Sequence, residues 1–545
     1  MSDQLMDAAT TTAPTVPGAG APQIDPVPRV SIQVFCETAD VAAIVQSAMT
    51  DRRMRKAHVK QNMGGAAAAC EAYRSAPTPN VIILEATSAR DTLLDQLDDL
   101  SQYCDAGTKV IVLGKVNDIV LYRQLIARGV SEYLVSPFTA VEFVQAVSNL
   151  FRAPGAKPLG RVVAVDTAQP DRAHWQEIVP ERAETLDGAQ IAGGKLILEY
   201  IKDAHSTAQI LTLDGKPVSD VAMPGIGTAV WSPARLDDTE MFYAFTGYTM
   251  PTTYYRIDVG TGKSALVRES KVAFDAPAYE TKQVFYNSKD GTRVPMFLSY
   301  RKGIRPDGNN PTILYGYGGF DIALTPAFSP AVATWMAHGG IYAVANLRGG
   351  SEYGEAWHEA GMRAKKQNVF DDFIAAAEWL IAHKYTSTPK LCIYGGSNGG
   401  LLVGAVLNQR PDLFGAAMPA VGVMDMLRFD KFGFGTQWTG EYGHPDNPAD
   451  FKVIRAYSPL HNIRKGVKYP PVLITTADHD DRVMPGHSLK YAAALQQAQE
   501  GPAPILIRID TRAGHGAGKP TTKVIDEWVD RFSFLAATLH IHIEE

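Results

Sequence analysis

The segment that most restricts the fold of this chain is KLCIYGGSNGGLLVGAVLNQRP, residues 390–411. An apolar stretch typical of a buried strand leads through small residues into an apolar stretch typical of a helix. The turn contains G-x-S-x-G at Gly395, Ser397 and Gly399. In this motif the glycines permit a tight strand-to-helix turn that lifts the serine hydroxyl above the sheet. The context favours a nucleophile at Ser397 over a simple glycine-rich turn, with the backbone N–H of Asn398 as an oxyanion donor.

A serine nucleophile in such a turn needs an orienting acid and a base, which follow it in that order along the chain. The strand-like stretch PVLITTA leads into an acidic cluster, where position alone leaves three acids open: Asp478, Asp480 and Asp481. His515, in a glycine-rich loop after the last predicted strand, is the candidate base for Ser397. His479 is the competing base, but its place inside the acidic cluster favours an ordinary loop histidine. The carboxylate would hold the imidazole in the correct tautomer.

Strand and helix patterns alternate from about residue 285 to the C-terminal end. Buried strands are expected at 295–300, 312–317, 341–347, 390–396, 471–477 and 505–510, with helices between them, for instance at 371–383. Apolar strands flanked by helices indicate a sheet covered on both faces. We therefore expect an α/β-hydrolase domain over residues 276–545.

Two regions of different character precede this domain. Residues 29–153 alternate five strand patterns with helical patterns, among them one at 119–128, which predicts a small doubly wound parallel sheet. Residues 161–275 contain short β-rich stretches separated by turn signals, as in the blades of a β-propeller. This region is long enough for two to three blades of about 40–50 residues each. Residues 1–28 are rich in Pro, Ala, Thr and Gly, and we expect them to be disordered.

The composition argues against several classes of partner. The net charge is −6 with both signs interspersed, which gives no reason to expect nucleic acid or an anionic membrane. The sequence has neither a stretch of about 18 apolar residues nor the pattern of a signal peptide. Four cysteines without C-x-x-C pairing or metal-ligand spacing indicate buried, inert thiols in a reducing compartment. We therefore expect a cytoplasmic protein with no metal or organic cofactor.

From about residue 160 to the end, the chain resembles prolyl oligopeptidase, a serine peptidase family whose hydrolase domain is capped by a seven-bladed propeller. The resemblance is carried by long stretches such as NPTILYGYGGF, YAVANLRGGSEYGEAWHEAG, GGSNGGLLVGAV, ADHDDRV and AGHGAGKP. It selects Asp480 as the acid of the triad. It also implies that the hydroxyl of Tyr317 is the second oxyanion donor. The implied activity is hydrolysis of short peptides on the carboxyl side of proline through an acyl-enzyme.

The resemblance further implies that Trp438 stacks on the substrate proline. A flat aromatic ring suits the rigid pyrrolidine ring, although the residues alone favour a packed loop tryptophan. The branch of the family that cleaves after basic residues would need acidic groups there instead. Arg482 would bind a substrate carbonyl just upstream of the cleaved bond. The remaining residues that the resemblance places at the substrate are Phe320, Tyr442, Val483 and Val423.

The chain departs from the family in two regions. The propeller segment resembles only the last blades, which predicts exposed blade faces and either marginal solubility or association. Residues 29–153 instead resemble the receiver-like N-terminal domain of pilus-assembly proteins of the Tad/Flp type. The positions used for phosphorylation hold Glu37, Glu85 and Ser136, so neither the acceptor Asp nor the Lys is present. We expect a module that is not phosphorylated and serves localisation or partner binding, joined to the hydrolase by fusion of two genes near residue 160.

Two alternatives to a proline-specific peptidase stay open. The first is a hydrolase of broader scope, such as an esterase or an aminoacyl-peptide hydrolase. The second is a localisation or interaction protein whose hydrolase part is inactive.

Overall fold

The computed structural model describes residues 27–74, 76–88, 90–105, 108–115, 121, 124–125, 128–150, 160–166, 169, 174–516 and 519–541. The chain divides into two compact units, Met1–Arg152 and Ala153–Glu545, and each is described by itself. The segment 1–26, for which disorder is expected, lies outside the described residues, as does part of the helix predicted at 119–128. Val27 is fully buried and its N–H donates to the Arg53 carbonyl at 2.9 Å, so the packed region begins before residue 29.

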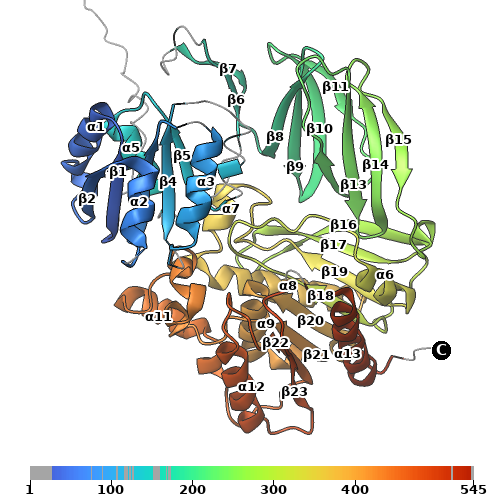
Figure 1. The fold of residues 1–545 in the computed structure, drawn as a ribbon. Helices are drawn as coiled ribbons and strands as arrows, with labels where there is room; N and C mark the ends of the chain where they lie inside the picture. Colours follow the sequence, from blue (N-terminus) through green and yellow to red (C-terminus); the bar gives the residue numbers. More distant parts are fainter. Residues whose placement is uncertain are drawn as a thin grey trace, which may run out of the picture. The chain divides into compact units, whose positions relative to one another are not determined.

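The first unit is a doubly wound parallel sheet with the strand order β2-β1-β3-β4-β5 (Figure 1). Every neighbouring pair in it is parallel, and the order is that of flavodoxin-like folds. The strands are β1 (Ser31–Cys36), β2 (His58–Met63), β3 (Val81–Ala86), β4 (Lys109–Gly114) and β5 (Glu132–Val135). The helices include α1 (Ala39–Met49), α2 (Gly65–Tyr73), α3 (Arg90–Ser101) and α5 (Ala140–Asn149).

Two apolar cores cover the two faces of this sheet. α1 and α5 pack on one face, around Ile32 and Ile83, while α2 and α3 pack on the other, around Ile82 and Leu84. The central strand β3 is buried along its whole length. This burial on both faces explains why residues 81–84 form a continuous apolar stretch rather than an alternating one.

Residues 160–275 form the β-rich part of the second unit, with two four-stranded antiparallel sheets. The first contains β8 (Thr185–Ala192), β9 (Lys195–Lys202), β10 (His205–Thr212) and β11 (Pro217–Val221). The second contains β12 (Thr228–Trp231), β13 (Glu240–Gly247), β14 (Met250–Asp258) and β15 (Ser264–Glu269). A separate pair, β6 (Val162–Ala164) and β7 (Gln176–Val179), packs on the first sheet. Two four-stranded sheets of this kind correspond to two propeller blades.

The second sheet presents one buried face and one exposed apolar face. Tyr243 and Phe245 on β13 are buried in a core shared with the first sheet. Phe242, on the opposite face of the same strand, is 45% exposed, and Tyr254 on β14 is 47% exposed. The exposed blade face expected from the sequence is therefore present, while association through it stays a prediction.

The C-terminal domain is built on an eight-stranded sheet in the order β16-β17-β19-β18-β20-β21-β22-β23. Its strands are β16 (Tyr279–Asn287), β17 (Arg293–Arg301), β18 (Thr312–Tyr315), β19 (Ile341–Ala345), β20 (Leu391–Gly396), β21 (Ala416–Ala420), β22 (Val472–Ala477) and β23 (Ile505–Asp510). β16 and β17 are antiparallel to their neighbours, and the pairs from β19 to β23 are parallel. This is the mostly parallel sheet that the sequence predicts for a hydrolase domain.

Helices cover both faces of this sheet (Figure 1). α8 (Gln367–Ala382), α9 (Asn398–Gln409) and α12 (Gly486–Ala498) share one core, and α6 (Pro330–Ala337) and α13 (Thr521–Leu539) share the other. Shorter helices, α7 (Glu355–Glu359), α10 (Thr439–Tyr442) and α11 (Pro448–Tyr457), lie in the connections. Among the helices of the described ranges, none has the length and apolarity to cross a membrane.

The sequence analysis missed two strands of this sheet. β21 has the sequence AAMPA, which contains no β-branched or aromatic residue, yet all five of its residues are buried. β16 is an edge strand in which most side chains are only partly buried, so its apolar pattern is weak. Neither has the strong local signal of its neighbours, and pairing within the sheet decides both.

Candidate active site

Ser397 lies in a tight turn between strand β20 and helix α9. Its backbone has φ 58° and ψ −117°, a conformation that non-glycine residues rarely adopt. A Cβ on Gly395 would lie 2.4 Å from the Gly399 carbonyl, and one on Gly399 would lie 2.6 Å from the Gly316 carbonyl. Both glycines of the motif are therefore required by close backbone approach. The N–H of Ser397 donates to the Ala420 carbonyl at 2.9 Å, which ties the turn to β21.

Of the three acids that the sequence left open, Asp480 contacts the candidate base. Its Oδ2 lies 2.7 Å from Nδ1 of His515. The Asp480 side chain is completely buried, and its Oδ1 accepts the N–H groups of Arg482 and Val483 at 3.1 and 2.8 Å. Two backbone donors thus fix the carboxylate, and its second oxygen is left to orient the imidazole.

The other candidates in the acidic cluster have other partners or are exposed to solvent. Oδ1 of Asp478 lies 2.6 Å from Nδ1 of His479, and both side chains are accessible to solvent. The hydrogen bond with His479 holds the pKa of Asp478 well below its usual range. Asp481 is exposed. His479 is therefore an exposed loop histidine paired with its own neighbour in sequence.

Tyr317 lines the same hollow as Ser397 and lies on the loop that follows strand β18. Burial, together with the charge of Glu441, raises the pKa of Tyr317 to about 12. The hydroxyl therefore keeps its proton at neutral pH and is available as a donor. The Asn398 side chain donates to the Tyr317 carbonyl at 2.6 Å and accepts the Tyr442 hydroxyl at 2.8 Å.

A hollow of about 350 Å³ opens at Ser397. It is lined by Tyr317, Phe320, Ile322, Ser397, Val423, Phe434, Trp438, Tyr442 and Arg482. Aromatic and aliphatic side chains thus surround the Arg482 guanidinium and the candidate nucleophile Ser397, a composition typical of small-ligand sites. The hollow brings together all the residues that the resemblance places at the substrate except Val483, which is buried in the apolar core.

Trp438 is held between two other aromatic rings. Its ring stacks on buried Phe429 with centroids 6.5 Å apart, and the edge of Phe320 approaches from the hollow at 6.5 Å. Phe320 also meets Tyr442 edge to face at 5.5 Å. These contacts restrict the rotation of Trp438, so that its ring can form a flat wall before any ligand enters.

Two lining residues were missed from the sequence, Ile322 and Phe434. Both are large apolar side chains that remain exposed, at 45% and 51%. Phe434 lies four residues before Trp438 in a glycine-flanked aromatic stretch, and Ile322 lies two residues after Phe320. That spacing was the only signal available, and it does not by itself distinguish a lining residue from a surface residue.

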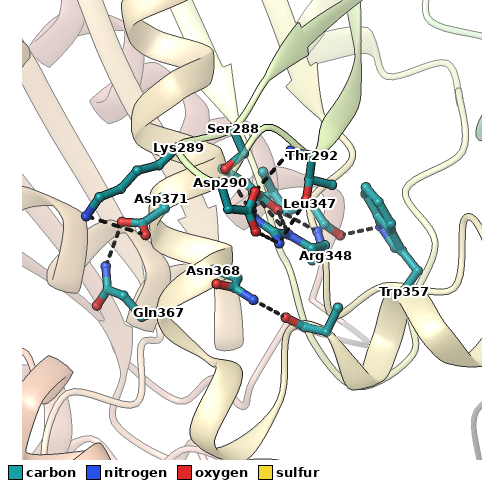
Figure 2. A network of polar contacts seen from close by, with 12 residues as sticks. Ser288, Lys289, Asp290, Thr292, Leu347, Arg348, Trp357, Gln367, Asn368 and Asp371 are labelled. Atoms are coloured by element: carbon teal, nitrogen blue, oxygen red, sulfur yellow. Dashed lines mark hydrogen bonds and ion pairs between the residues drawn. The ribbon is translucent and has the colours of Figure 1, made fainter.

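Arg348 is a buried arginine within a network of polar contacts (Figure 2). The Arg348 guanidinium bonds Asp372 and Asp290, each with a shortest distance of 2.5 Å, and also reaches Thr292 and Ser288. The next residue, Gly349, has φ 94°, and its carbonyl accepts the Asp321 N–H at 3.1 Å. A Cβ on Gly349 would lie 2.8 Å from the Gly318 carbonyl, so the two loops are in contact.

Comparison with known proteins adds two family matches. Residues 326–542 match the prolyl oligopeptidase family, and residues 142–270 match the N-terminal β-propeller domain of prolyl oligopeptidase. The second match begins within helix α5 of the first unit.

Individual relatives agree with these matches. The prolyl endopeptidase of Elizabethkingia meningoseptica is 46% identical over 378 residues, covering 69% of this chain and 54% of the relative. Prolyl oligopeptidase A of Galerina marginata is 41% identical over 408 residues, covering 73% and 55%. The chain therefore spans about half the length of the curated relatives it matches.

Solved structures show the same relation. A structure from a study of two prolyl endopeptidases superposes with a TM-score of 0.68 at 50% identity, covering 71% of this chain and 57% of that chain. Prolyl oligopeptidase B of Galerina marginata, bound to a 35mer hydrolysis and macrocyclization substrate, superposes with a TM-score of 0.67 at 37% identity. That superposition covers 71% of this chain and 56% of the other.

Proposed function

This chain belongs to the prolyl oligopeptidase family, and on that premise we propose that it is a serine endopeptidase that hydrolyses short peptides on the carboxyl side of proline. One observation carries the proposal: Ser397 and Trp438 line the same hollow of about 350 Å³. The proposed nucleophile and the proposed proline-binding ring thus face one ligand volume. The pair formed by His515 and Asp480, 2.7 Å apart, supplies the base and its orienting acid.

The proposed reaction is an acyl transfer in two steps. His515 takes the proton of the Ser397 hydroxyl as its oxygen attacks the carbonyl carbon of the substrate proline. Asp480 holds Nδ1 of the imidazole and stabilises the positive charge that forms. The N–H of Asn398 and the hydroxyl of Tyr317 donate to the oxyanion. His515 then protonates the leaving amine, and water releases the peptide from the acyl-enzyme by the reverse sequence of proton transfers.

The hollow also accounts for the proposed choice of proline. A pyrrolidine ring presents a flat apolar face, which Trp438 can cover, while Phe320 and Tyr442 close the sides. Arg482 is the charged group of the lining, and its guanidinium can donate to a substrate carbonyl without pairing with a charge on the peptide. A proline residue would therefore bury more apolar surface here than alanine does.

Hydrolysis of a blocked Gly-Pro chromogenic amide by the full chain tests the proposal, with Ser397→Ala as the blank. We expect turnover that disappears in Ser397→Ala and is retained in His479→Ala, the matched control at an exposed histidine. A sample that cleaves a simple ester far better than the proline amide would favour a hydrolase of broader scope. Folded protein that cleaves neither substrate would refute the peptidase and favour an interaction protein.

We propose separately that the first unit is a receiver-like module that is not phosphorylated. At the position of the phospho-acceptor, the buried Glu85 carboxylate accepts the N–H groups of Glu37 and Thr38 at 2.7 and 2.9 Å. Through these bonds Glu85 binds backbone N–H groups at the N-terminus of α1, where a negative charge is favourable. A role in partner binding, the relation to pilus assembly and a cytoplasmic location stay predictions. Incubation with acetyl phosphate should leave the intact mass unchanged, and a gain of one phosphoryl group would overturn this proposal.

A further inference from the structure

A buried polar cluster that contains an ion pair lies next to the hollow but contributes nothing to its lining: Lys366, Glu441 and His358. Their side chains are only 1%, 4% and 4% exposed. Glu441 Oε1 accepts from Lys366 Nζ at 3.1 Å, and Glu441 Oε2 lies 2.8 Å from His358 Nε2. Burying charges is costly even when they are paired, so such a cluster is weak evidence for stability. Its contacts point to a different role.

Lys366 connects the cluster to the loop that carries Tyr317. Its Nζ donates to the Gly318 carbonyl at 2.9 Å. The preceding carbonyl, that of Tyr317 itself, accepts from the Asn398 side chain at 2.6 Å. Two consecutive carbonyls, those of Tyr317 and Gly318, are therefore each held by a side chain, one by the residue after the nucleophile and one by Lys366.

Glu441 connects the same cluster to the proposed proline pocket. It lies in the short helix α10, three residues after Trp438 and immediately before Tyr442. A Cβ on Gly319 would lie 3.0 Å from Glu441 Oε1, so the loop and the helix are in close contact at this carboxylate. One side chain therefore joins the loop of the oxyanion donor to the helix that begins immediately after Trp438.

The loop needs such anchors because its backbone is strained. Phe320 and Asp321 have φ 58° and 57°, in the left-handed region that non-glycine residues avoid. Conformations of this kind persist only where surrounding contacts impose them. The ion pair beside Gly318 supplies one such contact on the Tyr317 side of the strained residues.

We propose that Lys366 and Glu441 are positioning residues that hold the Tyr317 hydroxyl where the oxyanion forms. They touch neither substrate nor reacting atoms and act through the carbonyl of Gly318. The inference rests on the proposed peptidase activity and deepens it, since it adds a buried ion pair to the oxyanion site. Loss of the pair should therefore lower kcat more than it raises KM.

A double-mutant cycle between Lys366→Met and Tyr317→Phe tests this role with the blocked Gly-Pro amide. Lys366→Met should lower kcat by about 10-fold or more, because a displaced oxyanion donor loses most of its effect. In the Tyr317→Phe background the same change should cost less than about threefold, since the group that Lys366 positions is already gone. Lys365→Met, at the exposed neighbouring lysine, is the matched control and should leave kcat unchanged.

Folding of each variant is checked by thermal unfolding. Should Lys366→Met not fold, the pair Lys366→Met/Glu441→Gln replaces it in the cycle, because no unpaired charge of that pair is then buried. Equal losses of kcat in both backgrounds, or no loss in either, would overturn the positioning role while leaving the peptidase intact. Absence of hydrolysis by the unaltered chain would instead overturn the proposed function, and this inference with it.

Discussion

Replacement of Arg348 by methionine is the sharpest test of how the active-site loops are supported. The Arg348 side chain is 4% exposed and the Asp372 side chain is completely buried. Arg348 Nε and one terminal nitrogen both bond the Asp372 carboxylate, with a shortest distance of 2.5 Å. Methionine fills similar space but donates no hydrogen bond, so Asp372 would keep only the Arg348 backbone N–H at 3.1 Å among these contacts.

The expected cost follows from the burial of the remaining carboxylate. Breaking a buried ion pair by removing one partner costs about 3–5 kcal/mol, because the other charge is left without compensation. For a domain of this size, about 1 kcal/mol corresponds to roughly 2–4 °C in Tm, so Arg348→Met should lower Tm by about 6–20 °C. Arg348→Met/Asp372→Asn removes the stranded charge as well and should recover at least half of that loss.

Thermal unfolding followed by circular dichroism measures both variants against a matched control. Arg508→Met breaks an ion pair whose acid, Asp530, is 56% exposed, so it should cost no more than about 1 kcal/mol. If Arg348→Met unfolds at the same temperature as Arg508→Met, burial does not set the energy of this network. Failure of Asp372→Asn to restore stability would likewise show that an uncompensated carboxylate is not the cause.

Three further predictions concern the site and its surroundings. Asp480→Asn should lower kcat by about 10⁴-fold with little change in KM, because the neutral amide no longer holds the imidazole in the correct tautomer; a loss below 10-fold would argue against this acid. Trp438→Ala should lower kcat/KM for a proline amide far more than for the matching alanine amide, and equal losses would remove Trp438 from the proline pocket. Burial raises the pKa of Glu352 to about 7, whereas the pKa of this group in the unfolded chain is 4.5. Between these two pH values the folded protein therefore keeps a proton that the unfolded chain has already released. The free energy of unfolding should therefore fall as pH rises from about 5 to 8. In Glu352→Gln, measured by urea unfolding, that fall should be smaller by up to about 3 kcal/mol. Parallel pH profiles of the two proteins would contradict the burial argument.

Much of the fold follows from local patterns in the sequence. The turn around Ser397 was recognisable because its residues follow a local pattern: a strand, a tight turn of glycines and a helix. The continuous apolar stretches of β3 and β22 indicate strands buried on both faces, and both are buried throughout. Strand β21 lacked any such pattern, and only its pairing with β20 and β22 makes it a strand.

The acid that pairs with His515 could not be identified from local sequence patterns. The residues alone left Asp478, Asp480 and Asp481 equivalent, and the resemblance to a family chose among them. The structure distinguishes them physically, since Asp480 turns inward toward His515 while Asp478 pairs with exposed His479. Asp478 and Asp480 are two positions apart in one loop, but only Asp480 bonds His515, which lies 35 residues further along the chain. That contact with a distant segment distinguishes the two acids.

The sequence by itself determined the two α/β sheets, the β-rich segment between them and the serine turn, because each depends on hydrophobic periodicity or on steric limits over a few residues. Only the tertiary structure decided the ion pair between Lys366 and Glu441, which are 75 residues apart. Opposite charges in a sequence carry no sign that they will be buried together, since burial depends on how separate elements pack. The same holds for the hollow over Ser397, whose lining comes from five separate segments of the chain.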